Sequence, residues 1–196
     1  MGKLNVALLC GGVSSEREVS LKGGEQVYEA LDKEKYQVSR YDPATDLKRL
    51  VSDAQGIDVA FIVLHGRWGE DGTVQGMLDL LNIPYQGSGV LGSALAMDKL
   101  LSKRLYQKAG LRVPPFDVVE KGQTVEPERF IRSPGYPLIV KPRHGGSSVG
   151  TNIISEPDQL PEAVRQALEF DTSAMVEAYI QGTEITGAVI GNEGLQ

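Results

Sequence analysis

The sequence predicts an α/β protein with an open parallel sheet and helices on both of its faces, followed by a small α+β unit. Three observations support this prediction. Apolar segments of strand length alternate with helix-like segments up to about residue 81. Beyond residue 113, short strand-like segments surround one helix-like segment, which is typical of an antiparallel sheet. Strand–helix alternation indicates a parallel sheet, whose ligands bind beyond the carboxyl ends of the strands.

In the N-terminal part, continuous apolar and β-branched residues mark strands, and helices fill the intervals between them. Ser20 is a suitable N-cap for the first helix, and Pro84 follows the end of the third. The expected strands are 4–10, 36–42 and 58–64. The expected helices are 20–31, 45–53 and 73–81.

A longer helix over 91–109 leads away from this sheet, and a domain boundary is expected near residues 95–100. The strands expected after it are 116–119, 137–141, 149–154, 174–180 and 184–190, with a helix at 158–170.

The composition of the chain argues against some classes of function and location. The chain has 196 residues, a net charge of −6 and no basic tract, which argues against broad nucleic-acid binding. No apolar run approaches the ~20 residues of a membrane span. The single cysteine, Cys10, follows an apolar segment and is expected to be a buried core thiol. Cysteine usage of this kind fits a reducing compartment, so we expect a cytoplasmic protein.

The segment 140-VKPRHGGSSVGTN-152 places Lys141 at the end of a strand and a loop of glycines and serines directly after it. Bare backbone N–H groups, two hydroxyls and a lysine suit a phosphate group. The order differs from a Walker A loop because the lysine precedes the glycines. A glycine-rich hairpin with a solvated lysine is the structural alternative, and this segment alone does not decide between them.

Two other loops leave the carboxyl ends of expected parallel strands. In 11-GGVSSEREVS-20, the Glu16 carboxylate could bind a substrate ammonium, although a solvated charged loop explains the segment equally well. In 65-HGRWGEDG-72, His65 lies where ligands bind in open α/β sheets. Glu70 and Asp71 in the same loop could simply favour the start of the next helix.

Three further residues have two interpretations each. A lysine on a helix, such as Lys99, is usually a solvated surface charge. Glu177 and Glu184 could be ordinary exposed strand residues. The intervening Ala178, Tyr179 and Ile180 nevertheless offer apolar edges and backbone groups of the kind that an adenine ring uses.

Taken together and in this order, the motifs GGVSSEREVSL, HGRWGEDGTVQG, GSGVLGSALAMDK, KPRHGGSSVG and EAYIQGTE resemble those of the D-alanine–D-alanine ligases of the ATP-grasp superfamily. The resemblance covers essentially the whole chain. It implies a substrate-binding domain at 1–96, a central ATP-grasp lid domain at 97–182, and the start of a third domain at 183–196. It also implies a cytoplasmic homodimer that acts in peptidoglycan precursor synthesis.

The resemblance assigns roles to individual residues. Glu16 would lie beside the ammonium of the first D-alanine and take part in catalysis, and His65 would lie near its carboxylate. Lys99 and Lys141 would bind the phosphates of ATP. Within the lid loop, Gly146, Ser147 and Ser148 would close over the nucleotide, with Ser147 nearest the reacting groups.

On the adenosine side, the resemblance places Glu177 at the adenine amino group, with the backbone of Tyr179 and Ile180 beside it. Glu184 would bind the ribose hydroxyls. The segment 142-PRHGG-146 departs from the usual family pattern, and His144 is expected to change lid contacts at most.

The family's Mg²⁺ ligands, its transition-state arginine and its second D-alanine site belong to the third domain, so we expect no metal ligand within these residues. Three hypotheses remain open. The chain is part of a D-alanine–D-alanine ligase, or a non-catalytic ATP-grasp module that binds nucleotide or amino acid, or part of a ligase that joins D-alanine to D-lactate or D-serine.

Overall fold

The N-terminal part of the computed structural model contains the expected parallel sheet, and the structure describes residues 2–132, 135–146 and 148–191. The strand order is β2–β1–β3, and both neighbours run parallel to the central β1. The strands are β1 (Leu4–Leu9), β2 (Tyr36–Tyr41) and β3 (Val59–Ile62).

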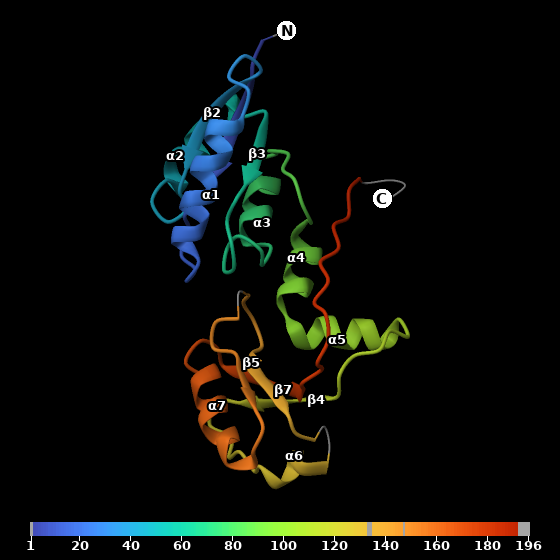
Figure 1. The fold of residues 1–196 in the computed structure, drawn as a ribbon. Coiled ribbons are helices and arrows are strands. Elements are labelled where there is room, and N and C mark those ends of the chain that lie inside the picture. Colours follow the sequence, from blue (N-terminus) through green and yellow to red (C-terminus); the bar gives the residue numbers. More distant parts are fainter. Residues whose placement is uncertain (1, 133–134, 147, 192–196) are drawn as a thin grey trace.

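Helices cover both faces of this sheet, as predicted (Figure 1). On one face, Ala7 and Leu9 of β1 share a buried core with helices α2 (Leu47–Asp53) and α3 (Thr73–Leu80). On the other face, α1 (Arg17–Ala30) lies so close that a Cβ on Gly24 would be 2.6 Å from the Cβ of Cys10. Cys10 is therefore a buried core thiol, as expected, and its burial raises the pKa of the thiol.

The second sheet has four antiparallel strands in the order β4–β7–β5–β6. Helix α7 (Leu160–Ala167) covers one face, where Val140 and Val176 are completely buried. The strands are β4 (Phe116–Glu120), β5 (Leu138–Pro142), β6 (Asn152–Ile154) and β7 (Ser173–Ala178). Short helices flank them at α6 (Glu128–Arg132) and η2 (Pro157–Gln159), whereas η1 (Ala54–Gly56) lies between α2 and β3 of the first sheet.

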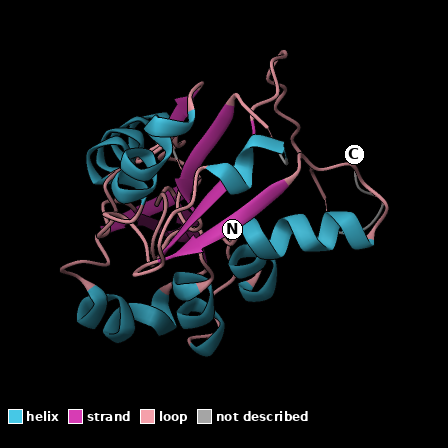
Figure 2. Cartoon of the chain, turned by 90° about the horizontal axis from the view of Figure 1, so that it is seen from below, coloured by secondary structure: helices cyan, strands magenta, loops and turns pink. Residues whose placement is uncertain are grey.

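Two helices connect the sheets, where the sequence predicted one helix over 91–109. They are α4 (Val90–Met97) and α5 (Lys99–Lys108), and they meet at an angle visible in Figure 1; Figure 2 shows the helices around the strands from below. The break occurs because Asp98 takes an extended backbone conformation, with its carboxylate accepting hydrogen bonds from the N–H groups of Leu100 and Leu101. Asp98 thus acts as the N-cap of a new helix.

Two other predictions were wrong. Ser20 is not the N-cap of α1, which begins at Arg17; its buried hydroxyl instead accepts from Gly11 N–H and donates to the carbonyl of Val63. Residues 184–190 form no strand. They are exposed and follow β7 as an extended segment (red in Figure 1), since no strand of the described residues pairs with them.

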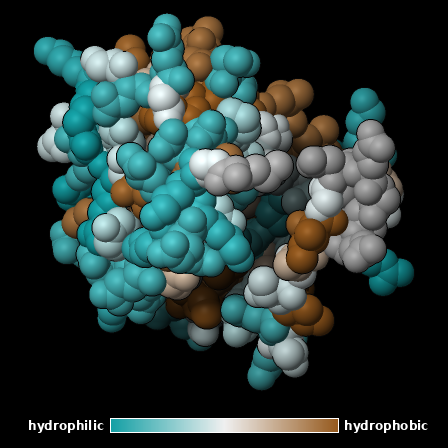
Figure 3. Space-filling model, turned by 90° about the horizontal axis from the view of Figure 1, so that it is seen from above, coloured by the Kyte–Doolittle hydropathy of each residue, from teal (hydrophilic) through white to brown (hydrophobic). Residues whose placement is uncertain are grey.

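The surface around the N-terminus is mostly hydrophilic, with hydrophobic side chains scattered over it (Figure 3). Among the residues that the structure describes, no helix has the length and apolarity needed to cross a lipid bilayer.

Candidate functional site

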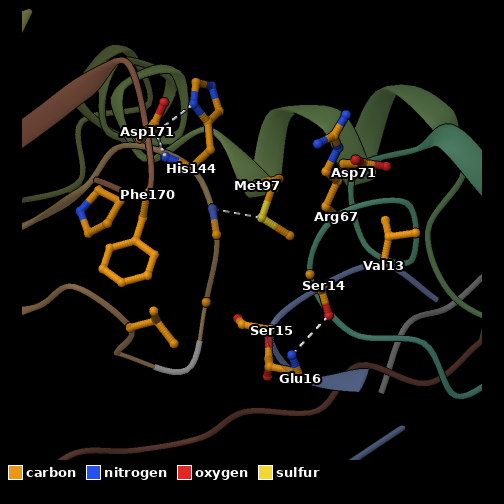
Figure 4. Close-up of a pocket in the computed structure, with 15 residues that line it drawn as sticks. Val13, Ser14, Ser15, Glu16, Arg67, Asp71, Met97, His144, Phe170 and Asp171 are labelled. Atoms are coloured by element: carbon orange, nitrogen blue, oxygen red, sulfur yellow. Dashed lines mark hydrogen bonds and ion pairs between the residues drawn. The ribbon is translucent and has the colours of Figure 1, made fainter. Parts of the chain in front are cut away.

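A cleft of about 470 Å³ lies where loops of the N-terminal sheet face loops of the second sheet (Figure 4). Its volume is in the range of small-molecule sites. Four loops and the end of α4 form its walls. The lining residues are Val13, Ser14, Ser15, Glu16, Gly66, Arg67, Asp71, Met97, Pro142, His144, Gly145, Gly146, Val149, Phe170 and Asp171.

Glu16 lies at the centre of this arrangement. Its backbone N–H donates to the hydroxyl of Ser14 at 3.1 Å, which fixes the turn just before α1. A Cβ built on Gly66 would be 3.3 Å from Glu16 Oε2, and one built on Gly146 would be 3.9 Å from the same atom. The Glu16 carboxylate therefore lies between the second loop of the N-terminal sheet and the glycine-rich loop.

The loop 65–72 is shaped by its own carboxylates. Glu70 accepts a hydrogen bond from Gly66 N–H, and Asp71 accepts from the N–H groups of Trp68 and Thr73. Burial raises the pKa of Asp71, but these hydrogen bonds outweigh it and leave the pKa below its usual value. Asp71 thus organises the loop before α3 and also lines the cleft.

His65 is placed beside the cleft and not in its lining, although its neighbours Gly66 and Arg67 line it. Its Nδ1 atom is 3.7 Å from Glu70 Oε1, and its side chain is 36% exposed. The imidazole is therefore accessible at the carboxyl end of the sheet.

On the opposite side, the start of the glycine-rich loop is fixed by two carboxylates. Arg143 donates two hydrogen bonds to Asp98, at 2.9 and 2.5 Å. His144 donates its backbone N–H to Asp171 at 2.7 Å, and its Nδ1 lies 2.9 Å from the same oxygen (Figure 4). The next residue, Gly145, donates its N–H to the sulfur of Met97.

Lys99 is half-buried beneath this loop and is not the solvated charge that its helical position alone suggested. Its ammonium donates to the carbonyl oxygens of Pro142, Arg143 and Gly145 at 3.0, 3.4 and 2.8 Å. Burial lowers the pKa of Lys99, and repulsion from Lys141 lowers it further. A negative ligand beside these two ammonium groups would relieve that repulsion.

Lys141 contacts the Oε1 atom of Glu177, and Lys103 lies 2.5 Å from Oε2 of the same carboxylate. Glu177 is 5% exposed. Burial raises its pKa, but the hydrogen bonds from the two lysines outweigh this effect and lower the pKa below its usual value. Among Lys99, Lys103, Lys141 and Glu177, three positive charges and one negative charge leave an excess of two.

The remaining predicted residues lie elsewhere around this cluster. Tyr179 follows β7, and its backbone N–H donates to the carbonyl of Pro137. Ile180 and Glu184 are exposed in the segment after β7. Ser148 lies in the glycine-rich loop with a positive φ of 58°, whereas Ser147 lies outside the described residues.

Several residues of the site carried no assigned role in the sequence. Arg67 belongs to a recognisable glycine-rich motif, so its position could have been anticipated. Lys103 lies one helical turn after Lys99, a spacing that predicts a shared helix face but not a shared carboxylate. Asp171 and Phe170 have no local signal, because only the tertiary fold brings them to the cleft.

Models of two protein families match the chain. One described as "D-ala D-ala ligase N-terminus" matches residues 5–51 and 40–88, and one described as "D-ala D-ala ligase C-terminus" matches residues 105–196. A D-alanine–D-alanine ligase of Syntrophobacter fumaroxidans is 57% identical over 194 residues. The chain belongs to the D-alanine–D-alanine ligase family. It covers 62% of the length of that relative, and 61% of the length of a ligase from Desulfotalea psychrophila that is 53% identical.

Solved structures of D-alanine–D-alanine ligase family members share the fold. The D-alanine–D-alanine ligase of Bacillus anthracis complexed with ATP has a TM-score of 0.81 and 36% identity, with 91% of this chain and 60% of that chain covered. The VanG D-Ala:D-Ser ligase of Enterococcus faecalis has a TM-score of 0.82 and 30% identity, with 100% of this chain and 68% of that chain covered.

The described residues fit the triphosphate of a nucleotide better than they fit a metal ion. The excess positive charge of the lysine cluster lies next to a glycine-rich loop. By contrast, within residues 2–132, 135–146 and 148–191 no group of three or more His, Cys, Asp or Glu side chains is arranged to hold a metal.

Proposed function

We propose that this chain forms the ATP site and the first D-alanine site of a ligase that joins two D-alanines for peptidoglycan precursor synthesis. One observation carries the proposal. Lys99 and Lys141 lie together at the base of a glycine-rich loop, and Gly146 of that loop faces the Glu16 carboxylate across the cleft. The lining of the cleft includes Glu16 and Gly146 but neither lysine, so the phosphate site would lie next to the cleft that holds the ammonium site.

The lysines would hold the phosphates. Lys99 reaches the loop carbonyls, and Lys141, close enough to repel it, extends from the end of β5 just before the loop begins. Positive charge placed before the reaction stabilises the charge that spreads over a transferring phosphoryl group. Gly146, Ser147 and Ser148 would cover the phosphates and exclude water, which would otherwise hydrolyse a D-alanyl phosphate.

Glu16 and His65 would bind the first D-alanine. The Glu16 carboxylate suits the ammonium of an amino acid, and the accessible imidazole of His65 suits its carboxylate. The two residues follow β1 and β3, adjacent parallel strands whose carboxyl ends share one edge of the sheet. In this arrangement the amino acid would lie between the N-terminal sheet and the phosphates.

The adenosine would lie near the end of β7. Glu177 would accept a hydrogen bond from the adenine amino group while keeping its lysine partners, because a carboxylate offers about four lone-pair sites. Tyr179 and Ile180 would supply apolar contact and backbone groups, and Glu184 would bind the ribose. We further propose the division into domains 1–96, 97–182 and 183–196, a homodimeric full-length enzyme, and Mg²⁺ ligands contributed by the part of the family fold that these residues do not cover.

The second substrate remains a separate question, because one relative of the same fold is a D-Ala:D-Ser ligase. A ligase specific for D-serine or D-lactate is thus a second candidate. A third is a module that binds nucleotide or amino acid without turnover. Both ligases and a nucleotide-binding module share the ATP site, so the first experiment addresses that site and the second addresses turnover.

Calorimetric titration of ATP into the 196-residue chain tests the nucleotide site. We expect binding that is weakened at least tenfold by Lys141→Met, because each charge-assisted hydrogen bond contributes about 1.5–3 kcal/mol. Lys108→Gln, at the exposed end of α5, is the matched control and should bind like the wild type. Equal ATP affinity in Lys141→Met and the wild type would refute the assignment.

Phosphate release with ATP and Mg²⁺ tests turnover, with D-alanine, D-serine and L-alanine compared. Release that depends on D-alanine alone would support the D-alanine–D-alanine ligase. Binding of ATP without any release would favour the non-catalytic module for the chain by itself.

A further inference from the structure

Lys103 has no assigned role in the proposed reaction, yet it is among the more enclosed charged side chains of the site. It lies on α5, one turn after Lys99, and its ammonium is 2.5 Å from Glu177 Oε2. The side chains of Lys103 and Glu177 are 12% and 6% exposed. The ammonium also lies 5.2 Å from the centre of the Phe116 ring. These contacts place the Lys103 side chain on the face of the sheet that bears Glu177 and Phe116.

The register of the second sheet explains why Lys141 reaches the same carboxylate. Glu177 of β7 lies opposite Ile139 of β5 and opposite Phe116 of β4. Lys141 is two residues after Ile139 on β5, so it projects from the same face of the sheet as Glu177. The carboxylate therefore has Lys141 on Oε1 and Lys103 on Oε2, one lysine for each oxygen.

We propose that Lys103 is a positioning residue for the phosphate site, acting on Lys141 through the Glu177 carboxylate that the two lysines share. This inference rests on the proposed function, because it assumes that Lys141 binds phosphate. Lys103 neutralises Glu177 from the α5 side and leaves Lys141 with positive charge that is not fully matched. Lys141 then retains attraction and hydrogen-bond donors for an anionic ligand.

The expected effect of Lys103 on phosphate binding is electrostatic. Without Lys103, the full negative charge of the buried Glu177 would be matched mainly by Lys141, and a phosphate would have to compete with Glu177 for it. In a partly buried site such competition is weakly screened by salt. Lys103 itself is less exposed than Lys141, whose side chain is 22% exposed, so Lys103 is the worse placed of the two to bind the ligand directly.

The test compares ATP affinity in Lys103→Gln, Lys103→Arg and the control Lys108→Gln. Lys103→Gln removes the charge and keeps a hydrogen-bond donor, and we expect ATP to bind roughly tenfold more weakly, as for the loss of one charge-assisted interaction. Lys103→Arg restores the charge and should recover most of the affinity. If Lys103 were needed only as a long side chain, Lys103→Gln and Lys103→Arg would bind ATP equally well.

A double-mutant cycle identifies the route of the effect. Because Lys103 acts through Glu177, Lys103→Gln should cause little further loss of ATP affinity in a Glu177→Gln background. The double variant also removes both members of the buried ion pair, so it guards against a single variant that fails to fold. Additive losses of affinity, or a Lys103→Gln chain that binds ATP like the wild type, would overturn the inference.

A nucleotide-free measurement separates this inference from the proposed function. In a ¹³C NMR titration of the Glu177 carboxyl group, Lys103→Gln should raise its pKa, since one of the two ammonium groups that lower it is gone. An unchanged pKa would overturn the inference even if ATP binds to the wild type. A wild-type chain that binds no ATP would instead overturn the proposed function, whatever the titration of Glu177 shows.

Discussion

The loop that carries Glu16 and the base of the glycine-rich loop face the same cleft, but they are held in different ways. In the first, side chains hold mainly backbone groups: Ser20 accepts from Gly11 N–H, and Asp42, which also pairs with Arg17, accepts from Gly12 N–H. In the second, ion pairs between side chains, such as Arg143 with Asp98, add to the hydrogen bonds that hold the backbone.

The difference follows from what each wall presents. A loop that offers one carboxylate to an amino acid needs only a fixed backbone. A wall that gathers positive charge for phosphates must balance that charge before a ligand arrives, and buried carboxylates such as Glu177 do so. We therefore expect substitutions in the charged wall to cost more stability than substitutions in the hydrogen-bonded wall.

The largest effect is expected for Glu177→Gln. This change leaves Lys103 and Lys141 without the carboxylate that they share, and breaking a buried ion pair by removing one partner costs roughly 3–5 kcal/mol. Urea denaturation of wild type and variant measures the free energy of unfolding. Glu162→Gln is the control, because its ion pair with Arg165 is exposed and should contribute little. Equal losses in the two variants would remove the contrast between buried and exposed charge.

A smaller effect, which depends on pH, is expected at Asp98. Burial raises the pKa of this carboxyl group, but hydrogen bonds from Arg143 and from Leu101 N–H outweigh it and lower the pKa to about 2. Because the folded pKa lies below the unfolded value of 3.8, the stabilisation is complete above pH 4 and is lost as pH falls toward 2. The shift corresponds to about 2 kcal/mol.

The measurement is the urea midpoint of wild type and Asp98→Asn between pH 7 and pH 2.5. Asparagine keeps the helix cap, so the difference reports the charge. We expect the wild type to be more stable near neutral pH and the difference to shrink as pH falls below 4. A difference that stays constant across this range would show that the Arg143 contact is not what stabilises Asp98.

The contrast between the two walls also explains which features of the molecule could be predicted from the sequence and which could not. Short-range patterns were sufficient for the parallel strands, the antiparallel sheet and the buried Cys10. The resemblance pointed to Glu16 and Gly146, which the fold brings to one cleft. Pairing at a distance could not be predicted: Lys103 meets Glu177 only because α5 packs beside β7, and Asp171 meets His144 across 27 residues of sequence.

Ser20 shows that a local pattern can also mislead within a single motif. A serine near a helix start predicts an N-cap, but the buried Ser20 hydroxyl instead satisfies two distant backbone groups.

The smallest effect is expected for Ser20→Ala in the hydrogen-bonded wall. The hydroxyl is fully buried, accepts from Gly11 N–H at 2.9 Å and donates to the Val63 carbonyl at 2.7 Å. Its loss leaves two neutral backbone groups unsatisfied and should cost roughly 1–2 kcal/mol in urea denaturation. Ser52→Ala is the matched control, since that exposed hydroxyl donates only to a carbonyl of its own helix and its removal should be nearly neutral. A loss at Ser20 as large as that at Glu177 would mean that the neutral wall is as costly to disturb as the charged one, and the charge balance around Glu177 would no longer explain the difference.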